Sequence, residues 1–133
     1  MRILYIGLGG SIGSLLRYVI SNIQLDTVNL FPIQTLSINI LGSCLLPFIV
    51  AFFSSTSFSK SVGFQGITVG FIGSFTTFSS FSYEFVFLYE NGFVLYAIYY
   101  FIGSMVFCTL FGMIGLQLGK FLNKRQMNEE DAH

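Results

Sequence analysis

Long apolar segments with almost no charge are the feature that most constrains this chain. Of its 133 residues, 53% are hydrophobic and only 9% are charged, and half of the charged side chains lie in positions 120–133. A soluble domain usually carries about a quarter charged residues. The remaining sequence therefore suits the interior of a lipid bilayer, and we expect an all-α membrane protein.

Four segments have the length of a membrane-crossing helix, which needs about 20 mostly apolar residues. They are residues 3–22, 33–53, 62–88 and 93–119. Short polar connections separate them, including one with Asp26, Asn29 and Pro32 and another with Glu90, Asn91 and Gly92. We predict a transmembrane domain over residues 1–119 and a polar, disordered tail over residues 120–133.

The distribution of positive charge predicts an orientation in the membrane. Four spans place both termini on one side, and that side collects five basic residues: Arg2, Lys60, Lys120, Lys124 and Arg125. The two opposite loops hold no Lys or Arg, although Arg17 lies near the far end of the first span. Positive residues favour the cytoplasmic face, so we expect both termini in the cytoplasm of a multi-pass cell-membrane protein.

Composition also argues against several classes of protein. The only histidine, His133, is the last residue, and Cys44 and Cys108 lie in apolar runs without ligand-spaced neighbours. We expect both cysteines to be buried packing residues, with no disulfide framework. Convergent catalytic groups are missing, so we do not expect an enzyme. Formal net charge is zero without a basic stripe, which removes nucleic acid as a partner.

The third apolar segment contains a stretch that predicts an interruption. Positions 70–84 read GFIGSFTTFSSFSYE, with two glycines and seven hydroxyl-bearing side chains. Backbone that leaves its helix at membrane depth is tolerated only beside protein or a water-filled cavity, and such breaks often form ion sites. We predict a break near the bilayer midplane. An intact helix with hydroxyls bonded to carbonyls one turn earlier remains an alternative.

Three spans each carry a polar stripe at helical spacing. The stripes are Thr35, Asn39 and Ser43 in the second span, Thr77, Ser80 and Glu84 in the third, and Tyr96, Tyr100 and Ser104 in the fourth. Polar side chains in a membrane face a partner or an aqueous path. Glu84 therefore indicates a pathway or a buried pair.

Aromatic and small residues follow helical spacing too. The third span carries phenylalanines at steps of three and four, namely Phe71, Phe75, Phe78, Phe81 and Phe85. Such a stripe is typical of packing, yet ring edges are electropositive and can face a small anion. Glycine pairs four apart predict tight helix contacts, within or between subunits; the pairs are Gly9 with Gly13, Gly66 with Gly70, and Gly115 with Gly119.

Several of these motifs together resemble the small four-helix fluoride channels called Fluc or CrcB. The motifs are GGSIGSLLRY at 9–18, TLSINILGS at 35–43, GFIGSFTTFSSFS at 70–82, and Tyr100 with Ser104. The resemblance covers the whole membrane portion. It implies an antiparallel dimer that conducts fluoride passively, exports it and so lowers its cytoplasmic concentration, with a structural sodium ion at the dimer axis.

The resemblance also implies roles for individual residues. Phe78 and Phe81 would turn ring edges toward fluoride, and Asn39 would donate its side-chain amide to the ion. The polar lining would comprise Thr35, Thr77, Ser80, Tyr100, Ser104 and Glu84. Gly73 and Thr76 would aim backbone carbonyls at sodium, and Arg17 would be a vestibule charge or a helix anchor.

Some features depart from this family pattern. Ser74 and Ile72 stand where glycine and cysteine are common, and Pro47 introduces a possible kink in the second span. The five-to-one charge bias indicates one preferred orientation, so our hypothesis is that the chain pairs with an oppositely inserted paralogue and conducts poorly alone. A second copy of this chain as the partner stays open. Two alternatives stay open: a proton-coupled small multidrug exporter that uses Glu84, and a non-transporting structural membrane subunit.

Overall fold

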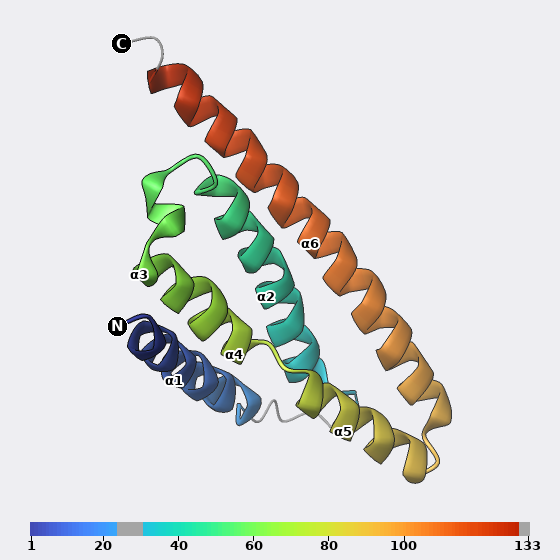
Figure 1. Cartoon of the computed structure of the whole chain (residues 1–133). Helices are drawn as coiled ribbons and strands as arrows, with labels where there is room; N and C mark the ends of the chain where they lie inside the picture. Colours follow the sequence, from blue (N-terminus) through green and yellow to red (C-terminus); the bar gives the residue numbers. More distant parts are fainter. Residues whose placement is uncertain (24–30, 131–133) are drawn as a thin grey trace.

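The computed structural model describes residues 1–23 and 31–130, and these residues form helices without strands (Figure 1). The elements are α1 (Arg2–Ser21), α2 (Ile33–Phe52), the 3-10 helix η1 (Ser57–Lys60), α3 (Val62–Gln65), the π-helix η2 (Gly66–Ile72), α4 (Gly73–Phe75), α5 (Phe78–Glu90) and α6 (Val94–Glu130). Within these described ranges, three helices are long and apolar enough to cross a membrane: α1, α2 and the Val94–Asn128 part of α6.

The predicted third span is divided into several pieces. α3, η2 and α4 follow one another without an extended residue, and the chain then leaves helical geometry at Thr76 and Thr77 before α5 begins. The predicted interruption is therefore present. The alternative of one uninterrupted helix is wrong, and this division is also why the segment lacks a single helix of spanning length.

α6 is longer than the sequence suggested. We expected a disordered tail from residue 120, but α6 continues to Glu130. Lys, Arg, Gln, Met, Leu and Glu are good helix formers and extend the last span. The Nδ2 group of Asn123 donates to the hydroxyls of Ser54 and Ser55, both at 2.9 Å, which joins α6 to the turn after α2.

Parts of the predicted loop and tail lie outside the described residues. These are residues 24–30, with Asp26 and Asn29, and residues 131–133, with His133. α2 is continuous through Pro47, so this residue does not divide the second span.

Glycines bring helix backbones together in two pairs of elements, α1 with η2 and α2 with α6. A Cβ atom on Gly9 or Gly13 would overlap the carbonyl oxygen of Gly66 or Phe71, respectively. A Cβ atom on Gly115 would overlap the carbonyl of Cys44 in α2. The predicted glycine contacts are thus confirmed within one subunit.

The start of α1, the turn after α2 and the last part of α6 lie at one end of the molecule. α1 and η2 run in the same direction, since Gly9 lies against Gly66 and Gly13 against Phe71. The start of α1 therefore lies near α3, as Figure 1 shows, and Asn123 brings the last part of α6 to the turn after α2 at the same end. Arg2 at the start of α1, Lys60 of η1 and the basic residues in the last part of α6 therefore lie toward this end.

Candidate functional site: a pocket at the helix break

The break consists of two threonines in extended conformation. Thr76 has φ −70° and ψ 151°, and Thr77 has φ −145° and ψ 126°. Thr77 caps the start of α5, because its hydroxyl oxygen accepts a hydrogen bond from the Ser80 amide at 3.2 Å. Threonine is a favoured N-cap residue, so the sequence Thr-Thr-Phe-Ser-Ser restarts a helix locally.

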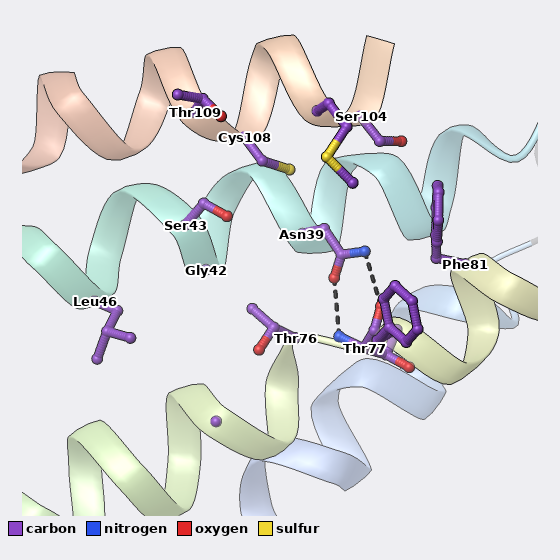
Figure 2. A pocket seen from close by; sticks show the side chains of 13 residues that line it. Asn39, Gly42, Ser43, Leu46, Thr76, Thr77, Phe81, Ser104, Cys108 and Thr109 are labelled. Atoms are coloured by element: carbon purple, nitrogen blue, oxygen red, sulfur yellow. Dashed lines mark hydrogen bonds between the residues drawn. The ribbon is translucent and has the colours of Figure 1, made fainter. Parts of the chain in front are cut away.

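Asn39 of α2 holds the other side of the break. Its Nδ2 group donates to the Thr77 carbonyl oxygen, and its Oδ1 atom accepts from the Thr77 amide, both at 2.9 Å (Figure 2). Asn39 therefore turns inward to the third segment. One of its two amide hydrogens is used in this pair, and the other is left for a further partner.

These bonds redirect the amides that would otherwise complete a helix. In a continuous helix the Gly73 carbonyl would accept from the Thr77 amide, and the Thr76 carbonyl from the Ser80 amide. Here the Thr77 amide donates to Asn39 and the Ser80 amide to the Thr77 hydroxyl. Both carbonyls thus lack their regular helical donor.

A pocket of about 520 Å³ lies beside the break, between α2, α4, the start of α5 and α6. Figure 2 shows the side chains of Ser104 and Cys108 on α6 across from Asn39 and Thr76. The residues that line the pocket are Asn39, Gly42, Ser43, Leu46, Gly73, Thr76, Thr77, Phe78, Phe81, Ser104, Met105, Cys108 and Thr109.

Phe78 and Phe81 form one wall of the pocket, but they differ in burial. Their ring centroids lie 5.8 Å apart, and Phe78 is 76% exposed whereas Phe81 is 6% exposed. The break separates them from Phe71 and Phe75, whose rings stack at 6.1 Å on the other side. Their spacing alone suggested that the five phenylalanines share one helix face. The break divides them between two helices, so they do not.

A polar cluster lies behind Phe81. Glu84 accepts hydrogen bonds from the Thr35 hydroxyl at 2.6 Å and from the Tyr100 hydroxyl at 2.7 Å. The Tyr100 ring lies 5.0 Å from the Phe81 ring and is fully buried. Three helices thus meet at one carboxylate, and each of the three residues belongs to one of the polar stripes.

Ser104 supplies a buried polar atom without a partner at the pocket wall. Its side chain is 7% exposed, and its Oγ atom has no hydrogen-bond partner in the described part of the chain. Buried hydroxyls are usually satisfied, so this unsatisfied hydroxyl is a candidate hydrogen-bond group for a ligand at the pocket wall.

Other predicted residues lie apart from the pocket. Ser80 contacts it only through Thr77, since the Thr77 hydroxyl donates to Ser80 Oγ at 3.2 Å. Tyr96 is 48% exposed and packs its ring on Phe93 at 6.2 Å, so it does not continue the stripe of Tyr100. Arg17 is a half-buried residue near the end of α1, outside the pocket lining.

Sequence reasoning missed part of the pocket wall. We expected Cys108 to be an ordinary packing residue, but it is half-buried and lines the pocket with Met105 and Thr109. The spacing of four from Ser104 places it on the same helix face and was a usable signal. Gly42 was also overlooked as a separate feature, although it lies three residues after Asn39.

These features define a helical membrane protein with a polar and aromatic pocket at an interrupted helix. The family described as "CrcB-like protein, Camphor Resistance (CrcB)" matches residues 4–116. The chain therefore belongs to the CrcB, or Fluc, family.

Similar proteins cover nearly the whole chain. "Fluoride-specific ion channel FluC 2" of Staphylococcus saprophyticus is 39% identical over 123 residues, which is 90% of this chain and 97% of the relative. A protein of the same name from Listeria monocytogenes is 36% identical over 128 residues, or 96% and 95% of the two chains. "Fluoride-specific ion channel FluC" of Geotalea daltonii is 34% identical over 121 residues, or 90% and 98%.

Proposed function

We propose that this chain forms a passive, fluoride-selective channel. The observation that carries the proposal is the pocket, where Asn39, Ser104 and the rings of Phe78 and Phe81 gather beside the helix break. The names of the full-length relatives support fluoride as the ion. No reaction is needed for conduction, and we propose no enzymatic activity.

The pocket offers weak partners that together replace the water around a small anion. Asn39 presents its remaining N–H, Ser104 its unpartnered hydroxyl, and Phe78 and Phe81 their electropositive ring edges. The Thr77 hydroxyl, which donates to Ser80 Oγ, lies at the pocket wall, and the Thr35, Tyr100 and Glu84 cluster continues the polar route behind Phe81. A series of weak contacts permits entry and exit, which conduction requires.

Arg17 and Ser80 have secondary roles in this proposal. Arg17, near the end of α1, is a vestibule charge or a helix anchor at the membrane interface. Ser80 supports the Thr77 side chain and so contributes to the polar lining indirectly.

We propose that the carbonyls of Gly73 and Thr76 bind a structural sodium ion. They fit a hard cation because they are oxygen ligands whose regular helical donors are redirected, and Gly73 is exposed on this single subunit. A bound sodium ion would supply fixed positive charge close to an anion path. The same two residues from a second subunit would complete the ligand set.

A second subunit in the opposite orientation completes the proposed channel. Phe78 is 76% exposed beside the pocket, an unusual position for a large aromatic residue next to a polar site. The third segment, broken into α3, η2, α4 and α5, also crosses the membrane and gives each subunit four spans together with α1, α2 and α6. The partner is another copy or a paralogue, and the uneven distribution of basic residues favours a paralogue that inserts the other way.

The proposed location is the cell membrane, with residues 1–119 in the lipid and both termini in the cytoplasm. The basic residues at one end of the molecule support this orientation. A membrane potential that is negative inside favours anion exit by about 2.3 kcal/mol per 100 mV. Passive conduction would therefore lower cytoplasmic fluoride.

Ion efflux from liposomes tests this function. Vesicles with the purified chain are loaded with fluoride, chloride or a cationic drug, and a potential is imposed without a proton gradient. We expect fluoride efflux with chloride retained. Drug transport that requires a proton gradient would instead support an exporter. Silence, also with an oppositely inserted paralogue present, would support a structural subunit.

A further inference from the structure

We infer that Asn39 is the positioning residue that keeps the third segment broken at Thr77. Its side-chain amide binds both backbone groups of Thr77 and thereby keeps the Thr77 amide away from the Gly73 carbonyl. The break is thus imposed by α2. The effect on the Gly73 carbonyl as a sodium ligand rests on the proposed function, whereas the backbone effect does not.

The geometry is that of a reciprocal amide pair. The two bonds of 2.9 Å join one side-chain amide to one peptide residue, with each partner donating once and accepting once. Asparagine has a short side chain on the continuous helix α2, so little freedom remains once both bonds form. The pair satisfies polar groups that a broken helix would otherwise leave exposed in a membrane.

Gly42 leaves space for Thr76, the other residue of the break. It lies on the same face of α2, three residues after Asn39, and a Cβ atom there would overlap the Thr76 methyl group. The Thr76 hydroxyl meanwhile donates to the Ile72 carbonyl at 3.1 Å, which directs the methyl group to α2. Asn39 therefore holds Thr77 by its backbone, and Gly42 admits Thr76 by its side chain.

Nothing in the local sequence of the break forbids a helix. The stretch from Gly73 to Phe78 contains no proline, and among the described residues Gly92 alone has positive φ. Threonine lowers helix stability by less than about 1 kcal/mol relative to alanine. Without Asn39, the Thr77 amide has the Gly73 carbonyl as its natural helical partner, and the segment is free to close.

The same pair sets the direction of the Asn39 donor. Because two bonds fix the amide plane, the second N–H has a set direction at the pocket wall. Positioning of this kind lowers the entropy cost of binding an ion. Loss of the pair would therefore alter both the break and the donor that faces the pocket.

Backbone chemical shifts of labelled threonine test this inference. The 13Cα and 13Cβ shifts of Thr76 and Thr77 distinguish extended from helical conformation in detergent micelles. We expect extended values in the original chain and a shift to helical values in Asn39→Leu, which keeps the side-chain size and removes both bonds. Thr68, buried in η2 and bonded to the Phe64 carbonyl, reports whether the variant is folded.

Two further variants sharpen the result. Asn39→Asp keeps an acceptor for the Thr77 amide, so Thr77 should stay extended. Asn91→Leu removes an asparagine that bonds only its own helix, to the Phe87 carbonyl, and should change neither threonine. Unchanged extended shifts in folded Asn39→Leu would overturn the inference. If that variant does not fold, helical Thr77 shifts in Asn39→Asp would overturn it, and extended shifts would support it.

The link to sodium is read separately at the Gly73 carbonyl. Its 13C shift should respond to added sodium in the original chain, and this response should be lost in Asn39→Leu. If the Gly73 carbonyl 13C shift in the original chain does not change on addition of sodium, the sodium site is removed from the proposed function. The threonine shifts would still decide whether Asn39 holds the break.

Discussion

The third segment is held in two different ways on the two sides of its break. Before the break, η2 lies against α1 through glycines, with backbone approaching backbone at Gly9, Gly13, Gly66 and Gly70. After the break, α5 is held by side chains, through the Thr35 and Tyr100 hydroxyls on Glu84 and the rings around Phe81. The first half depends on the absence of side chains and the second on their chemical identity.

This difference suits the two tasks of the segment. Close backbone packing leaves few alternative positions, so η2 and α4 form a fixed support. The Glu84 carboxylate and the Phe81 ring on α5 have partners in α2 and α6, and Phe81 also lines the pocket. Substitutions should accordingly affect the first half through size and the second half through chemistry.

The largest effect is expected from Gly13→Val. The new side chain would overlap the Phe71 carbonyl oxygen, which is backbone and cannot rotate aside as a flexible side chain can. We expect destabilisation by about 3 kcal/mol or more, or loss of folded protein. Thermal unfolding and gel filtration in detergent measure this. Gly7→Val in the same helix, where no atom lies within 4 Å, is the matched control; equal losses would contradict backbone packing as the cause.

A smaller effect is expected when the Glu84 cluster loses hydroxyls. Thr35→Val and Tyr100→Phe each remove one donor to the carboxylate and should each destabilise the chain by about 1.5–3 kcal/mol. Because both donors share Glu84, the double variant should depart from additivity by about 0.5 kcal/mol or more. Denaturant unfolding of the four chains measures this coupling.

The control for this cycle is Tyr96→Phe, since Tyr96 is 48% exposed and outside the cluster. This variant should change stability by less than about 0.5 kcal/mol. Strict additivity of the Thr35 and Tyr100 variants would mean that the three residues do not act as one unit.

The two pocket phenylalanines should separate stability from conduction. Phe81→Ile should destabilise the chain by about 1–2 kcal/mol, because Phe81 is 6% exposed among aromatic neighbours. Phe78→Ile should change stability by less than about 0.5 kcal/mol, because Phe78 is 76% exposed. Both variants should slow fluoride efflux. Unchanged fluoride flux in the Phe78 variant would show that this ring has no role in conduction.

The smallest effect on folding is expected from chemical modification of the cysteines. Cys108 lines the pocket, whereas Cys44 does not. A small thiol reagent should therefore reduce fluoride efflux through Cys108. Cys108→Ala should remove this sensitivity and Cys44→Ala should retain it. The opposite pattern would place the ion path away from the α6 wall.

The interruption was predictable because glycine and hydroxyl residues cluster within an apolar span. The meeting of Thr35, Glu84 and Tyr100 was also foreseeable, since polar groups in lipid seek one another. The pairing of Asn39 with Thr77 was not, because it joins residues 38 positions apart and depends on how two helices are aligned. Helical spacing assigned Tyr96 to the same stripe as Tyr100 and Ser104. Tyr96 is nevertheless 48% exposed, whereas the other two side chains are buried.

The end of α6 shows a second limit of sequence reasoning. Polar composition suggested disorder after residue 119, yet the same residues are good helix formers and continue an existing helix without a new nucleation step. The π-helical geometry of η2 also could not be predicted from the sequence. It coincides with the close approach of Gly66 and Gly70 to α1, a contact between distant segments that no local pattern predicts.

α6 has a practical consequence for anyone who wishes to observe this protein. Its 37 residues extend about 55 Å, well beyond the roughly 30 Å of hydrocarbon in a bilayer. One unbroken rod thus carries Ser104 and Cys108 and also projects into water. A fluorophore or a fiducial domain fused in register to that rod would report the tilt of the pocket wall without touching it.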